Sequence, residues 1–165
     1  MSERKYILSA DTAARKLERM AYEIAERNTG ATSLVLAGVH ENGMHLAVLL
    51  QKMLVTIGLP PADLVEIQLD KKHPTTVTLS KDIPMDGQTI ILVDDVANSG
   101  KTLLYALKPF LHKHPAGIQT LVLVDRAHKA YPVQPDYVGL SLSTTLQEHI
   151  FVEVEKDGVK GAWLE

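Results

Sequence analysis

The sequence contains no cysteine among its 165 residues. The chain can therefore form neither a disulfide framework nor a metal site built on thiolates. Long apolar runs are missing as well, because none approaches the ~18 residues of a membrane-spanning helix. The polar start, residues 1–5, lacks the apolar core and the cleavage site of a signal peptide. We therefore expect a cytoplasmic protein with no membrane segment.

An excess of one charge is also missing. Seventeen basic and 20 acidic residues give a formal net charge of −3. This balance argues against a protein whose main task is to neutralise a nucleic-acid backbone. The length fits one domain spanning residues 1–165, because independent folding units usually contain ~100–150 residues.

Segments typical of strands alternate with segments typical of helices. The apolar spacing predicts helices over residues 11–27, from Met44 to the stop at Gly58, and over residues 101–112. Apolar strands are expected at residues 32–37, 65–69, 90–93 and 121–124, with further strand-like pieces at residues 76–79, 137–142, 150–154 and 159–163. This alternation predicts an α/β fold with a mostly parallel central sheet flanked by helices, and a small C-terminal strand or hairpin region.

The most informative segment runs from Ile90 to Thr102. It passes from a buried strand to a pair of carboxylates, then to a turn of small residues and a helix. Open parallel sheets bind ligands beyond the carboxyl ends of their strands, which is where Asp94 and Asp95 are expected. Two carboxylates there can accept hydrogen bonds from the two vicinal hydroxyls of a ribose. A bare Asp-Asp pair is more often a solvated turn, but the whole arrangement favours a ligand site.

The turn after the carboxylates suits a phosphate group. Asn98, Ser99 and Gly100 are small enough for backbone N–H groups to approach phosphate oxygens, and the helix that starts there adds the positive end of its dipole. Ser99 and Thr102 add hydroxyl donors. Acceptors for sugar hydroxyls beside donors for a phosphate indicate a ribose 5-phosphate site. A nucleotide-binding P-loop is excluded, because that motif requires glycine where this chain has Asp95.

The same segment resembles the phosphoribosyl pyrophosphate signature of type I phosphoribosyltransferases. The resemblance extends over most of the chain and is greatest to the group of pyrimidine-operon attenuation regulators and uracil phosphoribosyltransferases, the PyrR-like group. The stretches that support it are Ala21–Asn28, Leu121–His128 and Asp136–Gly139. It implies the type I phosphoribosyltransferase fold and a homodimer.

The resemblance also implies roles for individual residues. Asp94 and Asp95 would contact the 2′- and 3′-hydroxyls of the ribose. The 5′-phosphate would be held by Val96, Ala97, Asn98, Ser99, Gly100, Lys101 and Thr102. The family's pyrophosphate loop corresponds to Gly38, Val39, His40, Glu41, Asn42 and Gly43. Its base or pyrophosphate region corresponds to Arg126 and His128, and its mobile loop to Lys71 and Lys72.

The reaction implied by the resemblance is transfer of ribose 5-phosphate from phosphoribosyl pyrophosphate to a nucleobase, with release of pyrophosphate. Mg²⁺ would be carried by substrate oxygens and water rather than by protein ligands, because it rarely enters all-protein sites. The purine enzymes carry an aspartate at the position of Asn98, where it can accept a proton from the base. Asn98 cannot do so, and uracil has a relatively acidic N–H, so uracil is the favoured substrate.

Two loops depart from the family pattern. The pyrophosphate loop of the PyrR-like group carries a lysine and an arginine, whereas here its interior holds Glu41 and no permanent cation. A Tyr-Arg-Asp-Asp stretch of the family is replaced by Leu69–Pro74, where Lys71 or Lys72 could supply charge without the two-pronged geometry of arginine. These departures leave open a non-catalytic regulator that senses a nucleotide or phosphoribosyl pyrophosphate. RNA attenuation is a weaker alternative, because acidic residues interrupt the basic residues near the N-terminus.

Overall fold

The structure is a computed structural model and describes residues 3–145 and 147–165. Its helices and strands follow one another in the order β1 (Lys5–Ser9), α1 (Ala10–Arg27), β2 (Leu34–Val39), α2 (Asn42–Ile57), β3 (Asp63–Gln68), β4 (Thr78–Leu79), β5 (Thr89–Ala97), α3 (Lys101–Ala106), the 3-10 turn η1 (Lys108–Phe110), β6 (Gly117–Arg126), β7 (Tyr137–Leu142), β8 (Ile150–Glu155) and β9 (Gly158–Leu164). No helix in these described ranges has the length and apolar character needed to cross a membrane.

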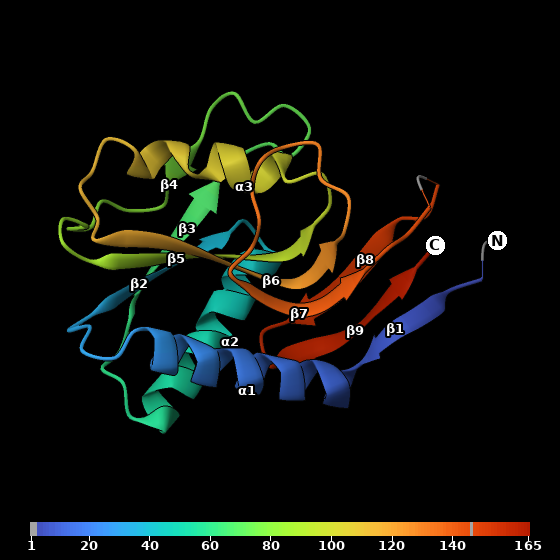
Figure 1. Cartoon of the computed structure of the whole chain (residues 1–165), viewed down its shortest axis with the longest axis horizontal. Coiled ribbons are helices and arrows are strands. Elements are labelled where there is room, and N and C mark those ends of the chain that lie inside the picture. Colours follow the sequence, from blue (N-terminus) through green and yellow to red (C-terminus); the bar gives the residue numbers. More distant parts are fainter. Residues whose placement is uncertain (1–2, 146) are drawn as a thin grey trace.

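The strands of the described residues form two sheets (Figure 1). The larger has the order β4-β3-β2-β5-β6-β7, with β4 antiparallel to β3 and all other neighbours parallel. The smaller consists of the antiparallel strands β1, β9 and β8. The predicted α/β fold with a mostly parallel sheet and a C-terminal hairpin is therefore confirmed.

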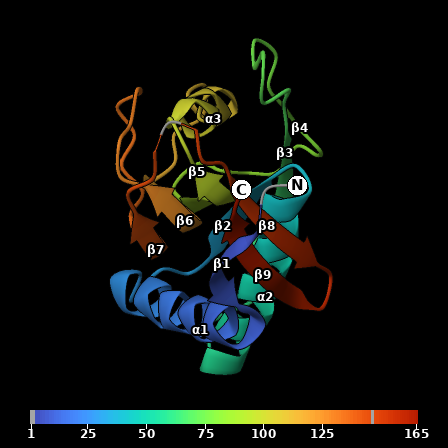
Figure 2. The same cartoon turned by 90° about the vertical axis from the view of Figure 1, so that its right-hand side faces the viewer.

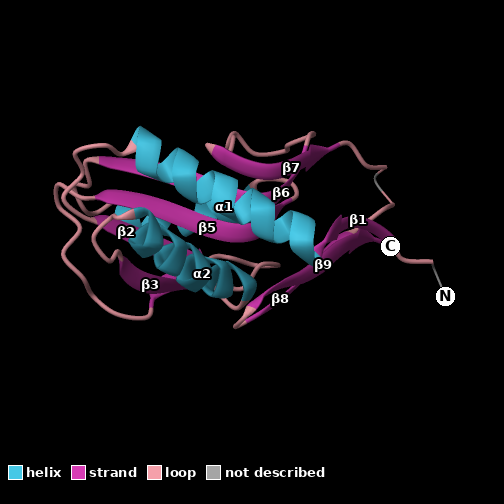
Figure 3. Cartoon of the chain, turned by 90° about the horizontal axis from the view of Figure 1, so that it is seen from below, coloured by secondary structure: helices cyan, strands magenta, loops and turns pink. Residues whose placement is uncertain are grey.

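Helices cover the large sheet on both faces. The helices α1 and α2 lie side by side over one face (Figure 3), and α3 lies over the other (Figure 2). The core under α1 and α2 continues into the small sheet through Leu8, Ala162 and Leu164. A second core under α3 and η1 contains Ile90, Leu92, Ala106 and Phe110. The α1 start is fixed by Ser9, whose hydroxyl accepts the N–H of Thr12 at 3.2 Å.

Three elements differ from the sequence prediction. The strand β5 runs on to Ala97, so the acid pair belongs to the strand instead of following it. The helix expected over residues 101–112 ends at Ala106 and gives way to η1, because Pro109 has no N–H and cannot continue an α-helix. The strand β1 was not expected at all. It pairs with β9 at the other end of the chain, and a local pattern carries no signal for such a distant partner.

Candidate substrate-binding site

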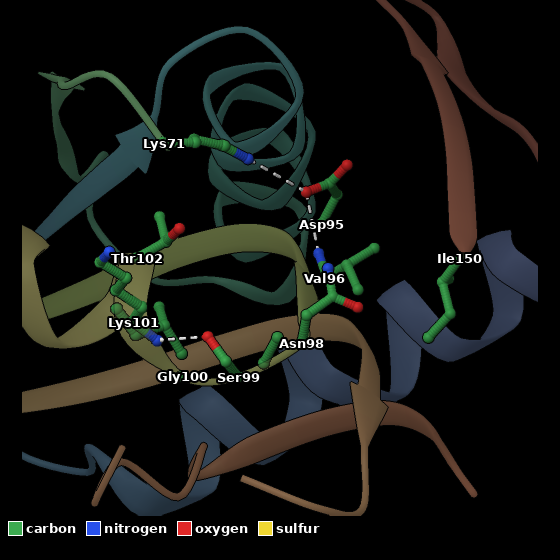
Figure 4. Close-up of a pocket in the computed structure, with 11 residues that line it drawn as sticks. Lys71, Asp95, Val96, Asn98, Ser99, Gly100, Lys101, Thr102 and Ile150 are labelled. Atoms are coloured by element: carbon green, nitrogen blue, oxygen red, sulfur yellow. Dashed lines mark hydrogen bonds and ion pairs between the residues drawn. The ribbon is translucent and has the colours of Figure 1, made fainter. Parts of the chain in front are cut away.

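A pocket of about 340 Å³ opens at the carboxyl end of β5. Its wall is formed mainly by the continuous stretch from Asp95 to Leu103, which comprises the end of β5, the bend after it and the first turn of α3 (Figure 4). Lys71 from the loop after β3 and Ile150 from β8 complete the lining. Ligand sites usually enclose ~300–1,000 Å³. One cavity of suitable size is therefore lined by the stretch that is expected to bind a phosphate. One of the two predicted carboxylates, Asp95, lines the same cavity.

The bend between β5 and α3 keeps backbone donors free. Gly100 has a left-handed backbone with a φ of 87°, and a Cβ there would lie 3.2 Å from the carbonyl oxygen of Tyr131. The Ser99 carbonyl accepts the N–H groups of Ala130 and Tyr131, both at 3.0 Å, which ties the bend to the loop after β6. Within the described residues, no partner is found for the N–H groups of Ser99 and Gly100. These two donors are available to an anion.

The helix after the bend contributes less than the sequence suggested. A helix dipole is the sum of its aligned peptide units, and α3 contains only six residues. The Ser99 hydroxyl accepts the N–H of Lys101 at 3.2 Å and retains its own O–H as a donor. Binding of a phosphate here would therefore depend on local N–H and hydroxyl groups more than on the dipole.

The two predicted carboxylates lie in different surroundings. Successive side chains of a strand point to opposite faces, and accordingly Asp94 is fully buried whereas Asp95 is 9% exposed and lines the pocket. Asp94 Oδ1 accepts the N–H of Asp95 at 2.8 Å, and Asp95 Oδ1 accepts the N–H of Val96 at the same distance. Asp95 thus faces the cavity directly, and Asp94 does not line it.

Lys71 connects the two acids. Its Nζ lies 3.3 Å from Asp94 Oδ1 and 3.7 Å from Asp95 Oδ1. Burial lowers the pKa of Lys71, but the charges of Asp94 and Asp95 raise this pKa by more, so it lies above the ordinary value. The ammonium group is therefore charged at neutral pH, and it contacts the carboxylate oxygens that a pair of hydroxyl donors would need.

Asp94 is poorly suited to carry a charge. Burial raises the pKa of Asp94 well above its ordinary range, and the charge of Asp95 adds to this shift while Lys71 opposes it. Asp94 Oδ2 has no hydrogen-bond partner among the described residues. Burial therefore disfavours the charged form of Asp94, and Lys71 is the neighbour that favours it.

The predicted pyrophosphate loop, residues 38–43, packs tightly onto the central strands. A Cβ at Gly38 would lie 2.5 Å from Met44 Cα, and one at Gly43 would lie 2.4 Å from the Val93 carbonyl oxygen. Only glycine allows α2 to start so close to β2 and β5. Of the six loop residues, Asn42 contacts the acid pair, since its Nδ2 donates to Asp95 Oδ2 at 2.9 Å and to the Val152 carbonyl at 3.1 Å.

His40 and Glu41 form a separate polar group. Glu41 has a φ of 63°, which is unusual for a residue other than glycine. Its exposed carboxylate lies 3.6 Å from His40 Nε2, and His40 Nδ1 contacts the carboxylate of Glu66 on β3. Neither residue lines the 340 Å³ pocket.

A second pocket of about 250 Å³ adjoins the first and shares Asn98 and Ser99 with it. Arg126 and His128 line this pocket, as do Thr144 and Thr145. The Arg126 guanidinium donates to Thr144 Oγ1 at 2.5 Å and to the Thr145 carbonyl at 3.2 Å. The structure thus brings Arg126 and His128 next to the phosphate bend, whereas Lys72 is exposed and lines neither pocket.

Several lining residues could not be found from the sequence. Ile150, Thr144 and Thr145 belong to the C-terminal region and reach the pockets only through the fold. Lys129 was also missed. Its Nζ contacts the Asp125 carboxylate and donates to the Arg126 carbonyl at 2.7 Å, and the side chains of Lys129 and Asp125 are both largely buried. The spacing of four residues between Asp125 and Lys129, directly after a strand, was the available signal.

Sequence comparison relates this chain to proteins of one known family. Residues 4–157 match the family model described as phosphoribosyl transferase domain. The bifunctional protein PyrR of Chloroflexus aurantiacus is 36% identical over an alignment of 170 positions, which covers 96% of this chain and 93% of that protein. The bifunctional protein PyrR of Deinococcus deserti is 38% identical over 93% of this chain and 90% of its own length.

Solved structures share the fold at lower identity. The hypoxanthine phosphoribosyltransferase of Trypanosoma cruzi aligns with a TM-score of 0.79 and 19% identity over 97% of this chain and 95% of that one. A hypoxanthine-guanine phosphoribosyltransferase of Bacillus anthracis aligns with a TM-score of 0.72 and 20% identity over 90% and 86%. The predicted type I fold is confirmed. The chain therefore belongs to the type I phosphoribosyltransferases, a family of pentosyltransferases, and is PyrR-like in sequence.

Proposed function

We propose that this chain binds phosphoribosyl pyrophosphate and transfers its ribose 5-phosphate to a nucleobase, with release of pyrophosphate. The observation that carries the proposal is the cavity that combines Asp95 with the bend around Ser99 and Gly100. A carboxylate with unused lone pairs lies there beside N–H donors for which the described residues provide no partner. A ribose 5-phosphate needs both, because its hydroxyls donate and its phosphate accepts.

In this proposal the ribose and its phosphate occupy different parts of the cavity. Asp95 accepts hydrogen bonds from the hydroxyls through the lone pairs that Asn42 and Val96 leave unused. Lys71 moves away from the acid pair when the substrate binds. The bend, residues 96–102, holds the 5′-phosphate. Lys71 then supplies a positive charge for the pyrophosphate, because residues 38–43 contain no lysine or arginine.

The second pocket supports a site for the nucleobase. Asn98 lies on the wall that both pockets share, and Arg126 and His128 line the far side. A nitrogen of the base would form a bond to C1 of the ribose while the bond from C1 to the pyrophosphate oxygen breaks. Catalysis would come from positioning and electrostatics. Asn98 offers no carboxylate for a proton of the base, which supports uracil.

Mg²⁺ would accompany the substrate. The described residues include no group of three or more His, Cys, Asp or Glu side chains arranged to hold a metal ion. The acid pair nevertheless suits a cation, because it already holds the Lys71 ammonium. The ion would be carried by substrate oxygens and water beside Asp95, and it would neutralise charge on the leaving pyrophosphate. Following the family resemblance, we propose a cytoplasmic homodimer that acts on small molecules.

Two glycines with positive φ give a matched test. Gly100 adjoins Tyr131 in the pocket wall, whereas Gly87 has a φ of 74° and open space where the methyl group of an alanine would lie. Both changes to alanine strain the backbone by about 1–2 kcal/mol. We expect Gly100→Ala to weaken UMP binding at least about tenfold by shifting the phosphate donors, and Gly87→Ala to leave it unchanged.

Calorimetry with UMP, and with phosphoribosyl pyrophosphate and Mg²⁺, measures these affinities. Pyrophosphate release in the presence of uracil measures turnover. Absence of both binding and turnover in the wild-type protein would reject the proposed function.

A ligand-sensing regulator is the second candidate. It is favoured by residues 38–43, which contain no lysine or arginine, and by the ion pairs that keep Lys71 on the acid pair. Tight binding of UMP or phosphoribosyl pyrophosphate without turnover of any nucleobase would support this candidate over the enzyme.

A further inference from the structure

Asn42 is the first residue of α2 and lies between three elements. Its Nδ2 donates to Asp95 Oδ2 on β5 at 2.9 Å and to the Val152 carbonyl on β8 at 3.1 Å. The orientation of the amide is unambiguous, because the Val152 carbonyl can only accept and would repel Asn42 Oδ1. Both protons of the amide nitrogen are therefore engaged.

The contact distinguishes Asp95 from its neighbour. Each carboxylate oxygen of Asp95 accepts one N–H, from Val96 at Oδ1 and from Asn42 at Oδ2. Asp94 Oδ2 finds no donor among the described residues. Hydrogen bonds to a carboxylate stabilise its charged form and fix its rotamer, so Asn42 acts on the one acid that faces the pocket.

We propose that Asn42 is a positioning residue, which holds the Asp95 carboxylate directed at the ribose hydroxyls and does not bind pyrophosphate. The role in substrate binding depends on the proposed function. Asn42 is not part of the pocket wall, and its donors are already used. Through Val152 it also ties Asp95 to β8, the strand that begins with the pocket residue Ile150.

The groups around Asp95 come from four parts of the fold. Lys71 belongs to the loop after β3, Asp94 to β5, Asn42 to α2 and the Val152 carbonyl to β8. Lys71 at 3.7 Å is the only cation of this set, and it leaves when substrate arrives in our proposal. Asn42 then remains as the side-chain donor that keeps the Asp95 carboxylate oriented.

Two variants separate the donor from the packing. Asn42→Leu nearly keeps the size of the side chain but removes the N–H without adding a charge, and Asn42→Ala removes both. Asn28→Ala serves as the matched control, because Asn28 also donates through a part-buried amide, to the Ile24 carbonyl at 2.9 Å, but at the end of α1. Thermal unfolding and circular dichroism verify that each variant is folded.

The first measurement needs no ligand. Carbon-13 NMR at one fixed pH follows the chemical shift of the Asp95 carboxyl group, with its signal identified by loss in Asp95→Asn. We expect this chemical shift to change in both Asn42 variants, because the donor 2.9 Å from Asp95 Oδ2 is lost, and to stay at its wild-type value in Asn28→Ala. An unchanged Asp95 chemical shift in both Asn42 variants would overturn the proposal, whether or not the protein proves to be a transferase.

The second measurement compares ligands. UMP carries the ribose and 5′-phosphate but no pyrophosphate. We expect Asn42→Ala to weaken UMP and phosphoribosyl pyrophosphate binding alike, by about tenfold, because a hydrogen bond to a charged group is lost. Weaker binding of inorganic pyrophosphate with unchanged UMP affinity would instead make Asn42 a pyrophosphate contact and refute the proposal. If the wild type binds none of these ligands, the proposed function fails and the NMR chemical shift of Asp95 alone decides the role of Asn42.

Discussion

Asp94 is a fully buried carboxyl group with a raised pKa. The folded protein keeps a proton on this group over a pH range in which the unfolded chain, where an aspartate has a pKa of about 3.9, has already released it. The contribution of this group to stability therefore falls as pH rises from about 3.9 toward the raised folded value. Asp94→Asn removes this dependence while keeping an acceptor for the Asp95 N–H. We expect it to stabilise the fold at pH 7 by about 1–2 kcal/mol.

Urea unfolding at pH 5 and pH 8 measures the effect of Asp94→Asn. The advantage of the variant should be larger at pH 8, because the free-energy cost of keeping a proton on Asp94 grows with pH until the raised folded pKa is reached. Asp82→Asn is the control, since Asp82 has a side chain that is 90% exposed and should change stability little. Equal differences from wild type at both pH values would contradict the assignment of the proton to Asp94.

Lys71 and Lys72 are adjacent in sequence but differ in position. Lys71 contacts both acids, whereas Lys72 lines neither pocket. We expect Lys71→Met to lower affinity for phosphoribosyl pyrophosphate about tenfold, because a charge-assisted hydrogen bond is worth ~1.5–3 kcal/mol. UMP affinity should not fall, since UMP has no pyrophosphate for Lys71 to contact. In the variant the ribose hydroxyls also no longer compete with the Lys71 ammonium for the carboxylate oxygens. Calorimetry on Lys71→Met and Lys72→Met checks this, and equal losses in both would refute a specific role for Lys71.

At the scale of elements, the small sheet carries an aromatic row. Tyr6 and Phe151 flank Trp163 on the neighbouring strands, with ring centroids 5.9 Å away on each side, and the Arg4 guanidinium lies 4.5 Å from the Trp163 ring. Trp163 itself is 9% exposed.

We expect Trp163→Ala to lower the free energy of unfolding by about 3 kcal/mol. Leu111→Ala, at a side chain that is 69% exposed, should cost at most about 0.5 kcal/mol. Chemical denaturation followed by circular dichroism compares them, and similar losses would contradict the packing role of the row.

Elements with a continuous local pattern could be predicted, and others could not. A few consecutive residues suffice to recognise the apolar runs of β5 and β6 and the helical spacing of α1. The apolar pattern of β5 stops at Asp94, however, although the backbone stays extended to Ala97. The position of Asp94 in the strand is what buries it, and this cannot be read from the segment alone.

The same limit applies to the site. The bend from Asn98 to Gly100 could be recognised because its donors lie within one stretch of sequence. The contact of Asn42 with Asp95 joins positions 53 residues apart, and the contribution of Ile150 requires the small sheet to fold against β5. The loop that contains Asn42 could be recognised from its sequence, but its amide could not be assigned to a carboxylate.

At the scale of the whole molecule, one apolar core joins the two sheets. It contains Leu17 and Ile24 of α1 together with Val154 and Leu164 of the small sheet. We propose that residues 1–165 form a single domain, and we expect both sheets to unfold in one cooperative transition, because neither can lose its packing without exposing the other. The single tryptophan, Trp163, reports on the small sheet by fluorescence, while circular dichroism at 222 nm reports mainly on α1 and α2. The two urea curves should coincide within about 0.2 M. A fluorescence transition that clearly precedes the loss of helix would mean that the small sheet opens independently, and that Ile150 and Val152 can leave the site while the acid pair stays in place.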